Sequence, residues 1–246
     1  MEIYHSQADQ PILDWQWLEP GLRNITAIIL RHLPSGGGKA LDVGHGTGRV
    51  TFQLAARGFQ VDAVDVEPRI VELAKRLAAA RHESDCYFRV GDFRDPEVVV
   101  PDHYDLVVCS EVLEHVVDYE SIYENIYRSL KPGGRVIITV PYDPKKFSVL
   151  DSYNGHVRRF SYSQVMNDLR PYRSKKIIIT GFPFYQLLCR AYLLKLSLTG
   201  GQHSNEELWT KRSTRVIARM IYPLCRFDNF FAFTCLGTNL IAIAEK

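Results

Sequence analysis

The sequence predicts an α/β protein in which helices cover both faces of a doubly wound parallel sheet. Two observations lead to this fold class. Short runs rich in β-forming residues alternate with helical patterns along most of the 246-residue chain. The runs Asp105–Cys109 and Arg135–Val140 are apolar apart from their first residue and Thr139, as expected for parallel strands buried on both faces. This length suits a single α/β domain.

The elements follow in order from these patterns. Seven strands are expected, at Ala40–Val43, Gln60–Val66, Tyr87–Val90, Tyr104–Cys109, Arg135–Val140, Lys176–Thr180 and Asn239–Ala244. Five helices are expected around them, at Gly21–Leu33, Thr47–Arg57, Pro68–Arg81, Tyr119–Leu130 and Ser161–Leu169. Pro68 suits a first helical turn, where its missing N–H is not needed. Gly58 and the cluster Pro132–Gly134 end the helices before them.

A long connection, Pro183–Asn229, separates the last two expected strands. It is basic, with seven Lys or Arg against three Asp or Glu. Apolar residues recur at helical spacing over Phe184–Leu198 and again over Leu208–Leu224, which predicts a helical insertion. Its apolar side is expected to pack on the sheet as a lid. The alternative, compatible with the first, is a basic amphipathic helix on an anionic membrane.

A glycine-rich turn follows the first expected strand. Asp42 lies in that strand, and Gly44, Gly46 and Gly48 come directly after it. Glycines let the backbone pass close to a ligand, and the start of the next helix suits an anion. The dinucleotide fingerprint would need a glycine where this chain has Arg49. The turn alone therefore leaves the cofactor open, and a purely structural turn is the alternative.

Acidic residues stand at the next two strand ends. Asp65 can accept hydrogen bonds from ribose hydroxyls, although a helix cap is an alternative role. Asp92 can accept from an adenine amino group while Phe93 covers the base, although Asp92 also suits a plain turn. Open α/β sheets bind ligands at these ends. The glycine turn, Asp65 and Asp92 follow three successive strands, and together they favour an adenosine-type ligand.

The stretch from Ala40 to Val140 resembles the class I S-adenosylmethionine-dependent methyltransferases. The matching pieces are Leu41–Gly48, Val64–Pro68, Val90–Phe93, Tyr104–His115 and Leu130–Arg135. The resemblance implies a seven-stranded sheet with an antiparallel last strand, and S-adenosylmethionine as cofactor. The implied cofactor-binding residues are Asp42, Gly44, His45, Gly46, Asp65, Val66, Asp92, Phe93 and Ser110. His45 departs from the family, which usually has a small residue or cysteine there.

Methyl transfer needs an aligned acceptor and, for a hydroxyl, a base. Glu111, Glu114 and His115 would share one face of a helix, and His156 follows the fifth strand to the same edge. We expect catalytic roles for His156, Glu111 and His115. An imidazole ordinarily titrates near neutral pH, which suits His156 as a general base.

The same residues could instead hold a metal. A divalent cation is a second cofactor candidate, with Glu111, Glu114, His115 and His156 as ligands. This arrangement resembles metal-dependent small-RNA 2′-O-methyltransferases, and Glu111–Val116 resembles ubiquinone-pathway O-methyltransferases. Glu-Val-Leu-Glu-His also occurs in metal-free members of the family, so both alternatives stay open. Arg158 and Arg159 are either an anion-binding pair or surface charges.

The insertion suggests the acceptor, a small molecule or a lipid-linked one. His156–Ser161 and Leu236–Lys246 also resemble bacterial methyltransferases of glycan and lipid-linked sugar assembly. An RNA 2′-O-methyltransferase and a non-catalytic cofactor-binding partner are the alternatives. A net charge of +2 argues against nucleic acid.

The rest of the composition bears on location and organisation. Five cysteines without a Cys-x-x-Cys pair and a polar Met1–Gln10 favour a cytoplasmic protein, with peripheral membrane contact as a further expectation. The oligomeric state is left open. We divide the single domain into an N-terminal helical lid (1–39), a cofactor-binding core (40–182), the insertion (183–229) and the last strand (230–246).

Overall fold

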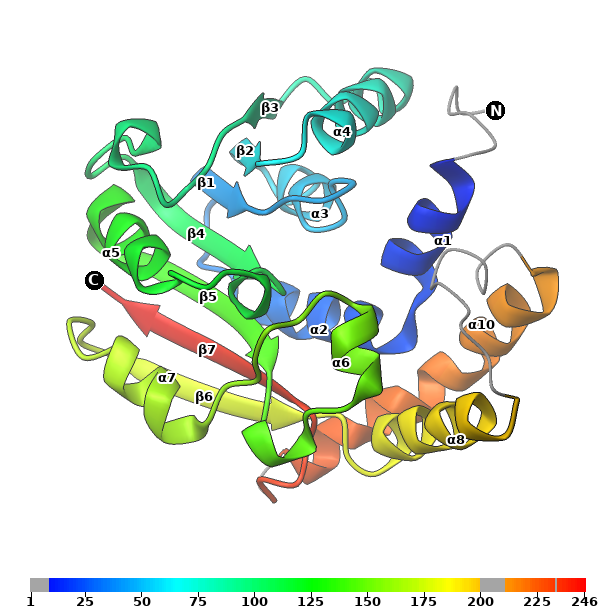
Figure 1. The fold of residues 1–246 in the computed structure, drawn as a ribbon. Helices are drawn as coiled ribbons and strands as arrows, with labels where there is room; N and C mark the ends of the chain where they lie inside the picture. Colours follow the sequence, from blue (N-terminus) through cyan, green and yellow to red (C-terminus); the bar gives the residue numbers. More distant parts are fainter. Residues whose placement is uncertain (1–8, 200–210, 233) are drawn as a thin grey trace.

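The computed structural model describes residues 9–199, 211–232 and 234–246, which fold around one seven-stranded sheet of order β3-β2-β1-β4-β5-β7-β6 (Figure 1). The strands are β1 Gly38–Val43, β2 Phe59–Asp65, β3 Cys86–Val90, β4 Tyr104–Ser110, β5 Leu130–Pro141, β6 Lys175–Thr180 and β7 Asn239–Glu245. β7 is antiparallel to both β5 and β6, and the pairs from β3 to β5 are parallel. The predicted fold class and its antiparallel last strand are confirmed.

All seven strands lie where the apolar runs place them, with one extension. β5 begins at Leu130 rather than Arg135, and its register against β4 shifts between Tyr104 and Leu106. A side chain at Gly134 would lie 3.0 Å from the carbonyl oxygen of Tyr104, so the two strands approach closely there. The cluster Pro132–Gly134 therefore follows the helix that ends at Ser129 and belongs to the first part of β5.

Helices cover both faces of the sheet. α2 (Pro20–Arg31) and α3 (Thr51–Ala55) pack in one apolar core with strand residues such as Leu106 and Val108. α5 (Glu120–Ser129) and α7 (Tyr162–Asp168) pack in another core with the alternate residues Val107 and Cys109. A third cluster joins α1 (Gln10–Leu18) and α4 (Pro68–Arg81) to β2 and β3. Successive strand residues thus point to opposite cores, which explains the unbroken apolar runs.

The described residues of the insertion include the helices α8 (Phe184–Thr199) and α10 (Arg212–Phe227), followed by the short helix η5 (Asp228–Phe231). α10 packs against α2, where the Arg23 guanidinium lies 3.7 Å from the centre of the Tyr222 ring. An ion pair of 3.0 Å joins Arg215 Nη1 to Asp14 Oδ2 of α1. The predicted apolar positions Leu208 and Trp209 lie outside the described residues. In the part of the chain that is described, no helix is long and apolar enough to cross a membrane.

Three short 3-10 turns and one short helix complete the fold, namely η2 (Pro96–Val98), η3 (Leu113–His115), η4 (Pro144–Lys146) and α6 (Val149–Tyr153). α6 was not predicted. Its start is fixed because the Ser148 N–H donates to Asp151 Oδ2 over 2.8 Å. β1 lies between β2 and β4, so the chain crosses to opposite sides of the sheet at this point. Such a switch point leaves a crevice at the carboxyl ends of the strands.

Candidate active site

A cavity of about 700 Å³ lies at that crevice. Its volume is in the range of small-molecule sites. Of the predicted site residues, those that line it are Asp42, Gly44, His45, Gly46, Ser110, Glu111, His115 and His156. The predicted residues outside its lining are Asp65, Val66, Asp92, Phe93 and Glu114. Residues from α6, α8 and α10 line the opposite side.

The glycine turn has a backbone that only glycine adopts easily. Gly44, Gly46 and Gly48 have φ values of 69°, 55° and 84°. A side chain at Gly44 would stand 2.3 Å from Val112 Cγ2. The Gly44 N–H donates to Val64 O over 2.8 Å, which ties the turn to the end of β2. The turn is thus a cradle that a Cβ atom would fill, as close approach to a ligand requires.

Two carboxylates flank the turn in different environments. Asp65 Oδ2 accepts from the Gly46 N–H over 3.0 Å, and Oδ1 accepts from the Glu67 N–H over 3.1 Å. A carboxylate has further lone pairs, so these bonds leave capacity for a ligand. Asp42 is buried, and burial raises its pKa to about 6 although the Thr51 hydroxyl donates to it over 2.7 Å.

His45 points into the protein as well as toward the cavity. Its ring stands edge-on to Phe88, with centroids 4.9 Å apart, and Nδ1 lies 2.7 Å from Gly46 O. Nε2 is buried and has no hydrogen-bond partner among the described residues. Burial lowers the pKa of His45, so the neutral ring is favoured beside the turn.

The residues expected to bind adenine, Asp92 and Phe93, are arranged differently from the prediction. Phe93 is only 4 % exposed, belongs to the core of the α5 face and lies outside the cavity lining. Its loop is anchored inward, where Asn125 Nδ2 donates to Phe93 O over 2.9 Å, and its role at the adenine stays a prediction. Asp92 faces Arg94, whose Nε donates to both carboxylate oxygens over 3.0 Å. This hydrogen bond holds the pKa of Asp92 below its usual range. Val66, at 62 % exposure, is open to solvent.

A hydrogen-bond chain follows β4 across to β5. Ser110 Oγ lies 3.0 Å from Thr139 Oγ1, and the Thr139 hydroxyl donates to Glu111 Oε1 over 2.9 Å. Glu111 itself has a φ of 58°, and residues Leu113–His115 form a 3-10 turn. The predicted helical face of Glu111, Glu114 and His115 was therefore wrong. The strand ends in a left-handed residue, and the Glu111 carboxylate accepts from Thr139.

Three of the four predicted metal-binding residues do come together. Donor atoms of Glu114, His115 and His156 lie within 4.8 Å of one another. Glu114 is fully buried, and neither carboxylate oxygen has a hydrogen-bond partner in the described parts of the chain. Burial raises the pKa of Glu114 well above its ordinary value. Glu111 is not part of this group.

His156 is oriented by Asp151, a residue that the sequence analysis missed. His156 Nδ1 lies 3.2 Å from Asp151 Oδ1, and Arg159 Nε donates to the same oxygen over 2.7 Å. Burial alone would raise the pKa of Asp151, but the hydrogen bonds from His156 and Arg159 hold it at about 2. The capping pattern Ser148-x-x-Asp151 in the sequence could have identified this residue.

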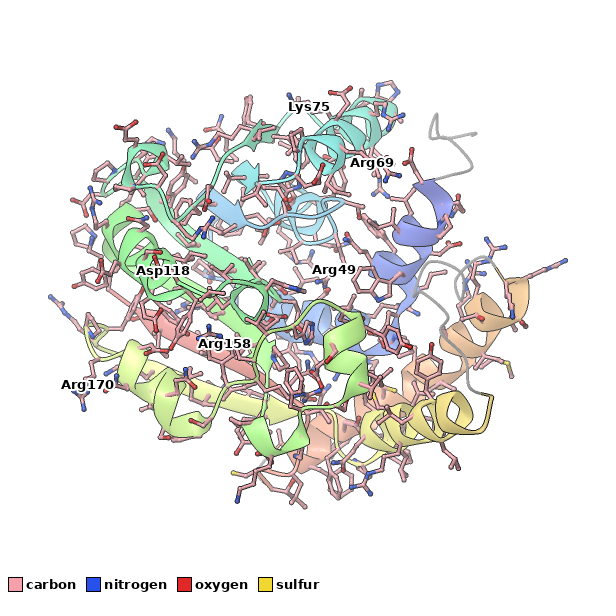
Figure 2. The ribbon with its side chains drawn as sticks, viewed as in Figure 1. Arg49, Arg69, Lys75, Asp118, Arg158 and Arg170 are labelled. Atoms are coloured by element: carbon pink, nitrogen blue, oxygen red, sulfur yellow. The ribbon has the colours of Figure 1, made fainter. Side chains whose placement is uncertain are left out.

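The two arginines after His156 have separate surroundings. Arg159 is bonded to Asp151 and lines the cavity. Arg158 donates to Val117 O over 2.9 Å and lies over the ring of Tyr119, outside the cavity lining (Figure 2). Arg158 and Arg159 therefore do not form a pair around one anion.

Gln16 of α1 and Arg49, which follows the glycine turn, are further site residues that the sequence did not reveal. Gln16 Oε1 accepts from the Thr47 N–H over 2.8 Å and from its hydroxyl over 2.7 Å. Arg49 lies between α1 and the strand ends (Figure 2), and its Nη1 donates to Leu22 O over 2.9 Å. Burial lowers the pKa of Arg49, while carboxylates including Glu111 and Asp42 oppose that shift. No local sequence motif predicts these contacts, because they join residues that are far apart in the sequence.

Known proteins match part of this chain in sequence. A family model described as a methyltransferase domain matches residues 34–187, more than half of the chain. Ubiquinone biosynthesis O-methyltransferase from Xylella fastidiosa is 33 % identical over 111 residues, which are 45 % of each chain. The Xanthomonas euvesicatoria protein of the same name is 35 % identical over 122 residues, 49 % of this chain and 51 % of that protein. The matched region spans about half the length of these curated relatives.

Solved structures share the fold at low sequence identity. Phosphoethanolamine N-methyltransferase 2 of Haemonchus contortus, in complex with S-adenosyl-L-methionine, has a TM-score of 0.66 and 18 % identity, over 96 % of this chain and 56 % of that one. The [4+2]-cyclase SpnF has a TM-score of 0.64 and 19 % identity, over 92 % and 80 % of the two chains. The family model, with this fold around a glycine cradle, identifies the chain as a member of the methyltransferase-domain family, with the class I S-adenosylmethionine-dependent fold.

Proposed function

We propose that this protein transfers a methyl group from S-adenosylmethionine to an oxygen atom of a small or lipid-like acceptor. One observation supports this most strongly: the glycine cradle and the Asp151–His156 pair face the same cavity. A cofactor held by the cradle would meet an acceptor held beside His156. The curated relatives that match in sequence are named as O-methyltransferases, which favours oxygen as the acceptor atom.

The residues at the strand ends fit the cofactor. The turn at Gly44 and Gly46 leaves room for backbone contact, and Asp65 has free lone pairs for ribose hydroxyls. Ser110 and Asp42 line the same side of the cavity. S-adenosylmethionine supplies an activated methyl carbon on its sulfonium, so the chain needs only to align the acceptor and remove a proton.

His156 has the geometry of a general base. Asp151 is ionised and accepts a hydrogen bond from Nδ1–H, which leaves the lone pair on Nε2, 3.9 Å from Glu114 Oε1. This is the tautomer needed to take a proton from an acceptor hydroxyl. Asp151 itself acts as a positioning residue, because its other contacts to Ser148 and Arg159 fix it in place.

A divalent cation would fit beside His156. His115 Nδ1 is engaged with Gly155 O over 3.1 Å and His156 Nδ1 with Asp151, so both Nε2 atoms are available. Such backing contacts are typical of metal-binding histidines. The buried, unpartnered carboxylate of Glu114 would be the third ligand. A cation held there would lower the pKa of an acceptor hydroxyl.

The acceptor side of the cavity favours an apolar molecule. Residues of the insertion that line it include Leu188, Tyr192, Leu193, Ile217 and Ile221. An acceptor with a prenyl or lipid part would bury apolar surface against these side chains. We also infer that such an acceptor is reached at a membrane surface, with the protein bound peripherally.

Turnover of radiolabelled S-adenosylmethionine tests the proposal against three acceptor pools: lipid extract, prenylated phenols and RNA. We expect label in the lipid or phenol pool, identified as a methyl ether by mass spectrometry. Label in RNA would instead support the 2′-O-methyltransferase alternative. Binding of S-adenosylmethionine in calorimetry without transfer to any pool would support the non-catalytic alternative.

Metal content tests the cation separately. We expect the purified protein to bind one Mn²⁺ or Zn²⁺ in calorimetry, and Glu114→Gln to lose that binding while cofactor binding remains. Glu124→Gln, on the exposed side of α5, is the matched control. Full activity after exhaustive chelation would contradict a catalytic cation and leave His156 as the sole base.

A further inference from the structure

The outward side of α10 carries large apolar side chains in solvent. Val216, Met220, Leu224 and Phe227 are 45 %, 72 %, 48 % and 53 % exposed. They recur at intervals of three or four residues, which places them on one side of the helix. Phe230 in η5 continues the series at 72 % exposure. These five residues are called the outer face of α10 below.

The opposite side of α10 is fully engaged. Ala218 and Cys225 are buried, and Arg23 lies over Tyr222 in the contact with α2. Arg215 pairs with Asp14 of α1. These contacts fix the rotation of the helix about its axis. The outer face is therefore held toward solvent by the fold itself.

A row of arginines follows one edge of the outer face. Arg212, Arg219 and Arg226 are spaced by seven residues and lie on adjacent positions of the helix surface, and all three are exposed. No hydrogen bond or ion pair engages their side chains among the described residues. The helix Arg212–Phe227 contains no acidic residue. In a chain with a net charge of only +2, this is a local concentration of positive charge.

We propose that the outer face of α10 binds the surface of an anionic lipid bilayer. An apolar strip with exposed arginines along its edge is the pattern of a helix lying in the membrane interface. The arginines would meet lipid phosphates while Met220 and Phe227 enter the acyl boundary. The charge complementarity commits the proposal to an anionic lipid rather than to a neutral membrane.

The same helix connects this surface to the cavity. Ile217, which is 52 % exposed, and Ile221 of α10 line the cavity, and Met220 and Leu224 belong to the outer face. α8, which lies beside α10 (Figure 1), also lines the cavity through Leu188 and Leu193. A bilayer on the outer face would thus lie close to the apolar half of the cavity. This step rests on the proposed function, since it explains how an apolar acceptor reaches the site.

Vesicle co-sedimentation tests the proposal with the full chain. We expect the protein to sediment with vesicles of phosphatidylcholine and phosphatidylglycerol, weakly with phosphatidylcholine alone, and less at high salt. The double variant Met220→Glu/Phe227→Glu should bind at least about a hundredfold more weakly, because two large apolar side chains leave the interface. The triple variant Arg212→Gln/Arg219→Gln/Arg226→Gln should also lose about a hundredfold, at roughly fivefold for each charge.

Matched controls place the same changes on other exposed surfaces. Tyr87→Glu/Val100→Glu is the apolar control, at 50 % and 43 % exposure. Arg57→Gln/Lys75→Gln/Arg170→Gln is the charge control, with residues on other parts of the molecule (Figure 2 labels two of them). Retained S-adenosylmethionine binding shows that each variant is folded.

Several results would overturn the proposal. The full chain could fail to bind anionic vesicles, or the outer-face variants could bind as well as their controls. A shift from dimer to monomer in sedimentation velocity, caused by the outer-face variants, would mean that a second copy covers this face. Vesicle binding by a protein that transfers no methyl group would support the lipid contact and contradict the proposed function instead.

Discussion

The two halves of the candidate site are built in different ways. The turn half, Asp42–Gly48 with Asp65, is shaped mainly by backbone bonds between neighbouring strand ends, such as Gly44 N–H to Val64 O. The histidine half, Glu114, His115, Asp151 and His156, depends on side chains from separate segments. A backbone N–H of Val157, donating to Glu114 O over 2.8 Å, holds those segments together. The turn half should therefore be sensitive to added atoms, and the histidine half to lost functional groups.

The largest effect is expected in the histidine half. His156→Asn removes the proposed base and should lower kcat by about a hundredfold to ten-thousandfold. Cofactor affinity should stay unchanged, because the turn half does not use this side chain. Steady-state kinetics and calorimetry measure the two quantities. His103→Asn, at the opposite end of β4, is the control, and equal losses in both variants would contradict the division into halves.

The turn half should show the converse behaviour. Gly44→Ala places a Cβ atom 2.3 Å from Val112 Cγ2, on a backbone with a φ of 69°. We expect cofactor affinity to fall by about a hundredfold in calorimetry, because the turn must shift away from the ligand.

Gly58→Ala separates the effect of backbone strain from the effect of the Cβ contact made by Gly44→Ala. Gly58 has a φ of 83°, but an added Cβ atom meets nothing within 4 Å. Both variants should lose about 1 to 3 kcal/mol of unfolding free energy from backbone strain. Only Gly44→Ala should lose cofactor affinity, and equal affinity in the two variants would show that the turn is not a ligand cradle.

A smaller effect is expected where α1 meets the turn. Gln16→Ala removes the acceptor for both the N–H and the hydroxyl of Thr47. Two lost hydrogen bonds correspond to about tenfold in cofactor affinity if α1 closes over the bound cofactor. Gln53→Ala, at an exposed hydrogen bond on α3, is the control. No difference from that control would mean that α1 does not act as a lid.

The smallest effect concerns Asp42, the buried side chain of the turn half. Burial raises its pKa to about 6, above the ordinary 3.8. The carboxyl therefore binds a proton more tightly in the folded protein than in the unfolded chain. Its stabilising contribution is complete below pH 3.8 and is lost as the pH rises through 6. Between pH 5 and pH 8 the wild type should lose about 1 kcal/mol more unfolding free energy than Asp42→Asn, measured by urea denaturation. Parallel pH curves would contradict the raised pKa.

Much of the fold could be predicted because its information is local. Buried parallel strands appear as apolar runs, and α4 begins at Pro68 and ends at Arg81 as expected. α6 was not predicted, because a five-residue helix is too short to show a helical periodicity in the sequence. The start of β5 was not predicted, because the sequence of its first residues is typical of a turn, although Leu130 pairs with Tyr104 of β4.

The site was less predictable because its geometry is tertiary. The cradle glycines could be identified, since strand ends and glycines are local features. The expected helix at Glu111 failed because a single left-handed residue ends β4 and breaks the assumed spacing. Phe93 turned inward because Asn125, far along the chain, anchors its loop. The Asp151–His156 pair depended on a short helix that the pattern did not reveal.

The position of β7 has a consequence for how the molecule assembles. β7 lies between β5 and β6, so among the described strands β6 pairs with β7 alone. During synthesis, β6 and α8 leave the ribosome before the strand that connects them to the sheet. Contacts between residues so far apart in sequence form slowly, because a long loop must close first. We therefore expect the first five strands to assemble early and the acceptor side of the cavity to be completed last.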